Sequence, residues 1–168
     1  DPTFDVEGVD AAHKITLLAM LCYGAKVSTK NVFVEGISRI SSMDIEFAEK
    51  LGFCIKLLAV SKEHQGKIEL RVHPTMIPRK HQLAGVGGAF NAVFLKGDAV
   101  GETLFYGQGA GMMPTASAVV SDIVAVARAH DEKGMVGIHD LEDIPTTPTN
   151  GIESEYYFRM QVVDKPRV

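Results

Sequence analysis

The sequence predicts a fold of the broad α/β type, more narrowly α+β, in which a β-sheet packs against helices. Three stretches predict it. FCIKLLAV (53–60) is a mostly apolar run of strand length, and KIELRVHP (67–74) alternates apolar with polar residues. Between the chain start and these strands, the run from Asp10 to Tyr23 is mostly apolar and long enough for a helix of about four turns. With 168 residues, the chain can bury a sizeable core.

Three helices are predicted. Glycines flank the run from Asp10 to Tyr23 at the places where a helix begins and ends. Ser41 and Ser42 offer an N-cap for MDIEFAEKLG (43–52), whose last glycine is typical of a helix end. PTASAVVSDIVAVARAH (114–130) opens on a proline that suits the first helical turn.

The remaining patterned segments are predicted to be strands. NVFVEG (31–36) is a short β-like run. Residues 53–60 are apolar enough to be buried on both faces, whereas the alternation in 67–74 indicates a half-buried strand with one face in water. NAVFLKGDAVGETLFYG (91–107) is typical of two strands joined by a turn at Gly97-Asp98.

The composition changes after His130. Residues 131–154 are rich in Gly, Pro, Thr and acids, which indicates a linker or a peripheral loop. Residues 155–168 then have the pattern of a first β-strand with nothing after it to cover it. A lone strand cannot bury its own face, so it either docks on the main domain or belongs to a domain whose remainder is absent. We expect this tail to be only loosely tied to the core.

Composition excludes several classes of function. The formal net charge is −4 and the basic residues are scattered, so nucleic acid is not an expected partner. The longest uninterrupted apolar run, residues 17–23, is far shorter than a membrane-spanning helix, so no membrane is expected. The six histidines show no metal-ligand spacing, and no metal site is predicted. Cys22 and Cys54 lie in apolar stretches, which fits buried thiols in the cytoplasm.

Asp10 and Lys14 are four residues apart, so they share one face of the predicted helix. An exposed pair of this kind is common and stabilises by only about 0.3–0.5 kcal/mol. The same face continues through Leu17, Leu18 and Leu21, which indicates that the helix runs into the core beyond Lys14. Partial burial lowers the pKa of a lysine, the direction that a proton-transferring amine needs, whereas a neighbouring carboxylate opposes it. Spacing alone leaves both interpretations open.

GQGAG (107–111) lies between a predicted strand and a predicted helix, where phosphate-binding turns occur. A complete GxGxxG fingerprint would need glycine at position 112, which is Met112. We therefore interpret the segment as a tight turn with closely packed backbone, not as a complete nucleotide site.

Several segments together resemble the homoserine dehydrogenase family. The opening DPTFDVEGVDAAHK (1–14) resembles the family signature, and the likeness continues in the family's order to about residue 130. The further matching segments are EGI, LGFCIKLLA, RVHPTMIP, FNAV and YGQGAGMMPTASAVVSD. The trailing YYFRMQVVDKP resembles the opening strand of the ACT regulatory domain that follows the catalytic part in many bacterial members.

The resemblance implies a mixed β-sheet covered by helices and an oxidoreductase activity. Family members interconvert L-homoserine and L-aspartate 4-semialdehyde with NAD(P), a step toward threonine, methionine and isoleucine. The cofactor is expected to be held mainly by an N-terminal Rossmann domain that is absent from this sequence, so this chain alone should be inactive. The alternative is a non-catalytic module for dimerisation and substrate binding.

The resemblance also assigns roles to individual residues. It implies that Lys14 is the catalytic residue, giving a proton to the carbonyl in reduction and taking it from the hydroxyl in oxidation. Asp10 matches the acidic partner of that lysine, and Asp5 matches a position that helps hold the substrate's amino group. Gly111 matches a glycine close to the cofactor.

The resemblance divides the chain into three parts. Residues 1–130 correspond to the catalytic and dimerisation domain, residues 131–154 to a linker, and residues 155–168 to the first strand of a truncated ACT-like domain. It implies a homodimer or a higher homo-oligomer in the cytoplasm, acting on a small-molecule substrate.

Overall fold

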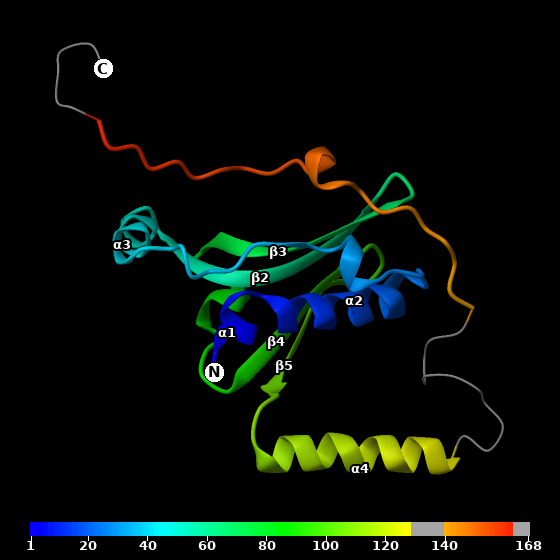
Figure 1. Cartoon of the computed structure of the whole chain (residues 1–168). Coiled ribbons are helices and arrows are strands. Elements are labelled where there is room, and N and C mark those ends of the chain that lie inside the picture. The colour runs from blue at the N-terminus through cyan, green and yellow to red at the C-terminus, as the bar shows by residue number, and fades with distance from the viewer. Residues whose placement is uncertain (129–139, 163–168) are drawn as a thin grey trace.

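The computed structural model describes residues 1–128 and 140–162 (Figure 1). Its elements in chain order are α1 (Thr3–Val6), α2 (Val9–Tyr23), η1 (Thr29–Asn31), β1 (Phe33–Val34), α3 (Ser42–Lys50), β2 (Phe53–His64), β3 (Lys67–Pro78), η2 (Gln82–Gly85), β4 (Phe90–Gly97), β5 (Gly101–Gln108), α4 (Met112–Arg128) and η3 (Thr149–Gly151). The three predicted helices are α2, α3 and α4, each within a few residues of its predicted bounds. Within the described ranges, no helix combines the length and the apolar character that a bilayer crossing requires.

Over the described residues, the main sheet has three strands in the order β1-β3-β2. β2 and β3 are antiparallel over their whole length, from Phe53 opposite Pro78 to His64 opposite Lys67. β1 runs parallel to β3, with Phe33 opposite Arg71. The sheet is therefore mixed, and helices pack on it, which confirms the predicted fold class.

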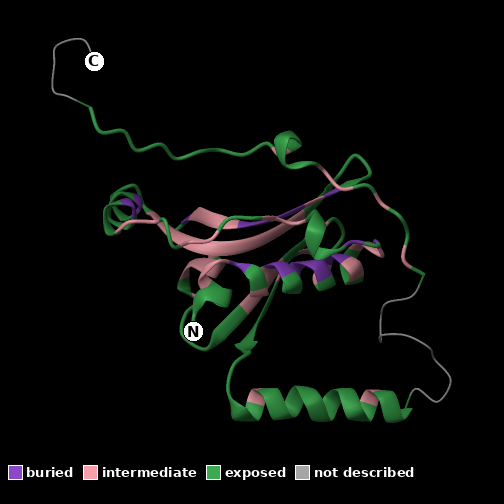
Figure 2. Cartoon of the chain, in the orientation of Figure 1, coloured by how far each residue is buried: buried purple, intermediate pink, exposed green. Residues whose placement is uncertain are grey.

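Helix α2 packs on the sheet and forms the core with it (Figure 2). The small side chains of Ala12 and Ala19 let the helix lie close to the strand. They meet Ile68, Leu70 and Val72 of β3, each at most 1% exposed, so the predicted burial of this alternating set is confirmed.

Two expectations about the sheet are wrong. Residues 53–60 are only half-buried within this chain, because the part of the chain that the structure describes does not fully cover both faces of β2. The expected wet face of β3 also carries Arg71, which is 7% exposed. Its Nη1 lies 2.7 Å from Glu69 Oε1, two residues away on the same face. Pairing allows two opposite charges to leave water together, which alternation of residue type does not reveal.

The hairpin β4–β5 forms a ladder of its own, from Phe90 opposite Gln108 to Gly97 opposite Gly101. The predicted turn after Gly97 is confirmed. Beyond β5 the chain bends into α4, which has no buried residue and is coloured almost entirely as exposed (Figure 2).

The segment Glu142–Thr147, here called the strap, is hydrogen-bonded to the core. Glu142 donates to the Gly24 carbonyl and accepts from the Lys26 amide, both at 2.7 Å. Ile68 of β3 donates to the Pro145 carbonyl at 2.9 Å, and its own carbonyl accepts from Thr147 at 2.8 Å. The expectation of a loosely tied tail is therefore wrong for this segment, because its backbone pairs in parallel with β3 at Ile68, before the stretch of β3 that pairs with β1. Residues 131–139 of the expected linker lie outside the described residues.

Residues 153–162 follow the strap and form neither helix nor strand. Arg159 Nε donates to Asp44 Oδ1 of α3 at 2.6 Å. Tyr156, Phe158 and Met160 are each more than 70% exposed. The predicted strand 155–168 is thus not formed over its described part, and residues 163–168 lie outside the described ones.

Candidate functional site

The candidate site begins at the turn between α1 and α2, which Gly8 forms. Gly8 is the N-cap of α2 with a φ of +79°, a left-handed conformation that glycine adopts most readily. Its amide donates to the Asp5 carbonyl at 3.1 Å, and its carbonyl accepts from the Ala12 amide at 2.9 Å. Gly8 directly follows Glu7, the C-cap of α1, and starts α2, so it joins the helix that carries Asp5 to the helix that carries Lys14.

Asp10 and Lys14 form the expected pair, with Asp10 Oδ2 and Lys14 Nζ 2.6 Å apart. The Lys14 side chain is 60% exposed and that of Asp10 is 36% exposed. Leu17 and Leu21, which follow on the same face, are each 46% exposed. The expectation that this face runs into the core is therefore wrong for Leu17 and Leu21, whereas Leu18 is half-buried and packs against the core. The core face itself is the one that carries Ala12 and its neighbours at helical spacing.

Asp5 lies exposed on α1. Among the described residues, its carboxylate has neither a hydrogen-bond nor an ion-pair partner. The two helices are held together partly by Phe4 and His13, whose rings meet edge to face with centroids 5.8 Å apart. The α1–α2 unit thus presents the carboxylates of Asp5 and Asp10 and the amine of Lys14, a set that can bind a cationic group through a carboxylate and exchange a proton through the amine.

Gly111 lies elsewhere in the fold, at the bend between β5 and α4. Its φ is +120°, and its carbonyl accepts from the Thr115 amide at 3.1 Å and from the Thr115 hydroxyl at 2.8 Å. This backbone fits the predicted tight turn. Asp5, Asp10 and Lys14 lie on α1 and α2, whereas Gly111 lies between β5 and α4, and no hydrogen bond within the described residues joins it to them.

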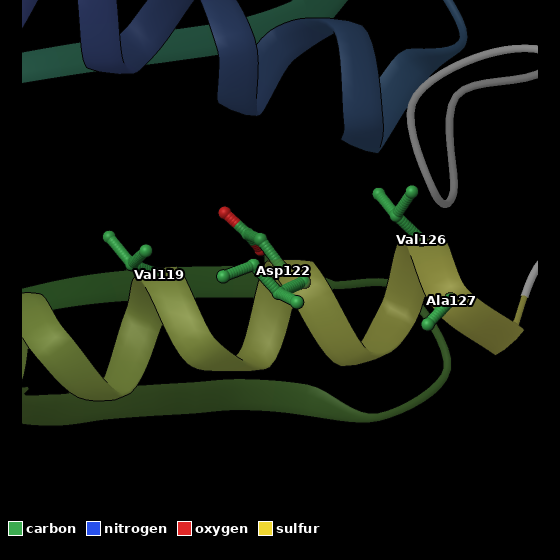
Figure 3. A pocket seen from close by; sticks show the side chains of 5 residues that line it. Val119, Asp122, Val126 and Ala127 are labelled. Atoms are coloured by element: carbon green, nitrogen blue, oxygen red, sulfur yellow. The ribbon is translucent and has the colours of Figure 1, made fainter.

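Two shallow hollows occur away from the α1–α2 unit. One lies along α4 and is apolar apart from Asp122 (Figure 3); its lining residues are Val119, Asp122, Ile123, Val126 and Ala127. The other lies on the β4–β5 ladder, between residues 91–93 and 104–109. Neither hollow contains a predicted site residue. In the described part of the chain, no group of three or more His, Cys, Asp or Glu side chains could hold a metal ion.

Comparison with known proteins identifies the family. The family model for homoserine dehydrogenase matches residues 1–124, which include Asp5, Asp10, Lys14 and Gly111. The chain belongs to the homoserine dehydrogenase family.

Individual relatives agree. The homoserine dehydrogenase of Pseudomonas aeruginosa is 48% identical over 175 aligned positions, which cover 100% of this chain and 40% of that protein. The crystal structure of a homoserine dehydrogenase from Thiobacillus denitrificans superposes with a TM-score of 0.83 at 46% identity, covering 90% of this chain and 37% of that one. A hyperthermophilic archaeal homoserine dehydrogenase in complex with NADPH gives a TM-score of 0.60 at 28% identity, with 79% and 36% covered. The chain therefore spans about two fifths of the length of the homoserine dehydrogenases it matches.

Sequence reasoning missed how the two helices of the site are joined. The signal was present in two matched segments, since Gly8 belongs to the opening motif and Gly36 to EGI. Their joint effect appears only when the two segments are seen in contact.

Proposed function

We propose that this chain is the substrate-binding and proton-transferring part of a homoserine dehydrogenase, which interconverts L-homoserine and L-aspartate 4-semialdehyde. The observation that carries the proposal is the Asp10–Lys14 pair, with 2.6 Å between Asp10 Oδ2 and Lys14 Nζ, inside the residues that the family model matches. The exposure of both groups leaves them accessible to a small molecule.

Lys14 is the proposed catalytic residue. In reduction, its Nζ gives a proton to the carbonyl oxygen as the carbonyl becomes a hydroxyl; in oxidation, the neutral amine takes that proton back. The Asp10 carboxylate holds the amine in place, and the Asp5 carboxylate, which has no described partner, binds the substrate's ammonium group.

NAD(P), when bound, supplies or accepts the hydride. Gly111 is the residue of this chain proposed to lie near it, because its bend exposes backbone without a side chain. Since Met112 breaks the glycine fingerprint, the cofactor is proposed to be held mainly by an N-terminal domain outside this sequence.

We further propose the domain division 1–130, 131–154 and 155–168, with the last part the first strand of an ACT-like domain. The exposed alternating side chains of Tyr156, Phe158 and Met160 support a strand that pairs outside this chain. A cytoplasmic homodimer or higher homo-oligomer is also proposed, and the exposed apolar side chains of β5, such as Leu104 and Tyr106, support association.

The test is Lys14→Ala in the enzyme complete with its nucleotide-binding domain. kcat should fall by about 10²–10⁴, the usual range for a positioned acid–base group, with a smaller change in KM. Asp5→Asn should mainly raise KM. The matched control is Lys50→Ala, because Lys50 forms a pair with Glu46 of the same spacing and the same 2.6 Å distance on α3. A kcat near that of the control would contradict the role of Lys14.

The second candidate, a non-catalytic module, is favoured by the 40% span of the chain on its relative. Homoserine oxidation by the 168-residue chain, measured with and without a separately supplied nucleotide-binding domain, separates the two. The chain alone should show no turnover and should sediment as a dimer or larger.

A further inference from the structure

The structure assigns a positioning role to Gly8 and Gly36: together they fix α1 against α2, and thereby fix Asp5 relative to the Asp10–Lys14 pair. This inference rests on the proposed function, because it matters only if these three side chains bind one substrate. Neither glycine is proposed to touch the substrate. Each acts through the turn Glu7-Gly8 that joins the two helices.

Gly8 is pressed against the sheet. A Cβ built on Gly8 would lie 2.8 Å from Cγ1 of Val72 and 3.4 Å from Cγ1 of Val34. Val72 is fully buried, and its β-branched side chain has little rotamer freedom, so it cannot yield without disturbing the core. Any side chain at position 8 would therefore push the start of α2 away from β3.

Gly36 presses on the same turn from another segment. A Cβ on Gly36 would lie 2.9 Å from Cα of Glu7, which is a backbone atom that moves only with the turn. The next residue, Ile37, donates its amide to the Val6 carbonyl at 2.8 Å, which ties the segment to the end of α1. The turn is thus held between β3 and the segment after β1.

The two contacts have a direct consequence for the site. Asp5 lies three residues before Gly8 and bonds to it through its carbonyl, whereas Asp10 and Lys14 follow within two turns of α2. A shift of the turn would change the separation of the Asp5 carboxylate from the Asp10–Lys14 pair. A substrate whose ammonium group is bound by Asp5 and whose reacting oxygen lies at Lys14 senses such a shift strongly, since charge-assisted hydrogen bonds depend on short distances.

The first test measures the arrangement of the helices without any ligand. Because the Phe4 and His13 rings meet edge to face, the His13 imidazole protons should carry a ring-current shift in NMR spectra, defined as the difference between the wild-type chain and Phe4→Leu. Gly8→Ala and Gly36→Ala should both reduce this shift. Gly24→Ala is the matched control, because Gly24 caps the other end of α2 with a φ of +62° and has nothing within 4 Å of a built Cβ.

A His13 ring-current shift that stays unchanged in both Gly8→Ala and Gly36→Ala, or that Gly24→Ala reduces equally, would overturn the inference. If Gly8→Ala fails to fold, Gly36→Ala decides, because the φ of Gly36 is not in the left-handed region. The second test titrates L-homoserine into the same chains. Its Kd should rise about tenfold in both site variants and stay unchanged in Gly24→Ala, the loss expected for one charge-assisted hydrogen bond.

The two tests can fail independently, so failure of the proposed function can be told from failure of the positioning role. No response of the wild-type chain to homoserine would contradict substrate binding by this chain, while the ring-current result would still decide the helix arrangement. A reduced ring-current shift with an unchanged Kd would overturn the positioning role itself.

Discussion

The strap offers the sharpest test of how this chain is held together, because one backbone amide carries much of its contact with β3. Thr147→Pro removes the amide that donates to the Ile68 carbonyl at 2.8 Å. Ile68 is 0% exposed, and its amide and its carbonyl are both hydrogen-bonded to the strap. The substitution would therefore leave the buried Ile68 carbonyl without a hydrogen-bond donor and without water to replace it.

The expected loss follows from that geometry. Leaving a buried carbonyl without a partner costs about 1–3 kcal/mol. The free energy of unfolding of the chain should therefore fall by about 1–3 kcal/mol, and the urea midpoint by on the order of 1 M. Amide exchange at Ile68 should also accelerate, because its hydrogen bond to Pro145 weakens when the strap lifts.

The control is Glu153→Pro, in the exposed segment just after η3, where the amide donates no hydrogen bond within the described residues. It should leave both the urea midpoint and Ile68 exchange unchanged. If Thr147→Pro behaved like Glu153→Pro in both measurements, the strap would not be docked as the structure has it.

Further predictions use the same urea titration. Asp10→Asn should change the free energy of unfolding by less than about 0.5 kcal/mol, because its pair with Lys14 is exposed; a larger loss would show a structural role for the pair. Val72→Ala should cost about 2–3 kcal/mol, since two buried methyl groups are lost beside a rigid helix; a loss below that of Asp10→Asn would contradict the assigned core. The Ser41 hydroxyl and amide donate hydrogen bonds to the Asp44 carboxylate, which lowers the pKa of Asp44 in the folded chain. The stabilisation from the ionised Asp44 is therefore fully present above the unfolded pKa of about 4 and is lost as the pH falls through the lower folded pKa. The stability of Asp44→Asn should thus fall less than that of wild type on acidification below about pH 4, and equal slopes would contradict this.

Local patterns predicted the elements because each depends on neighbouring residues alone. Ser41 accepts a hydrogen bond from the Asp44 amide at 3.3 Å as an N-cap, and Gly24 ends α2 in the left-handed region, as spacing indicated. Ile68, Leu70 and Val72 show period two and lie in the core.

What failed depends on contacts between distant segments. The strap is rich in residues typical of loops, yet its hydrogen-bond partner Ile68 lies 77 positions before Pro145 and 79 positions before Thr147. Arg71 and Glu69 alternate as a wet face would, yet they are largely buried as a pair. Residue type predicts neither outcome, because both depend on which backbone or charge lies opposite.

The same limit applies to the site. The motif located Asp10 and Lys14 on one helix face, and the 2.6 Å ion pair confirms that local prediction. Their surroundings were predicted only in part: Leu18 packs against the core, whereas Leu17 and Leu21 were expected there and are each 46% exposed. Apolar residues at helical spacing show that a helix face can be buried, but they do not show which surface buries it. In this chain Ala12 and Ala19 occupy the core side, since their small side chains allow closer contact with β3.

The exposed leucines therefore bear directly on how Lys14 would work. Leu17 and Leu21 lie about one and two turns beyond Lys14 on the same face, so any surface that covers them also borders the amine. Such a surface would exclude water from one side of the Asp10–Lys14 pair and strengthen its electrostatic contact with a bound substrate. The chain spans two fifths of its relatives, which leaves room for such a surface elsewhere in the protein. Replacing Leu17 and Leu21 with serine tests whether this face is covered in the complete enzyme. Each substitution should change the free energy of unfolding of the isolated chain by no more than about 0.5 kcal/mol, as other surface changes do, whereas the complete enzyme should lose activity. Equal activity of the double variant in the complete enzyme would show that this face stays open to solvent during turnover.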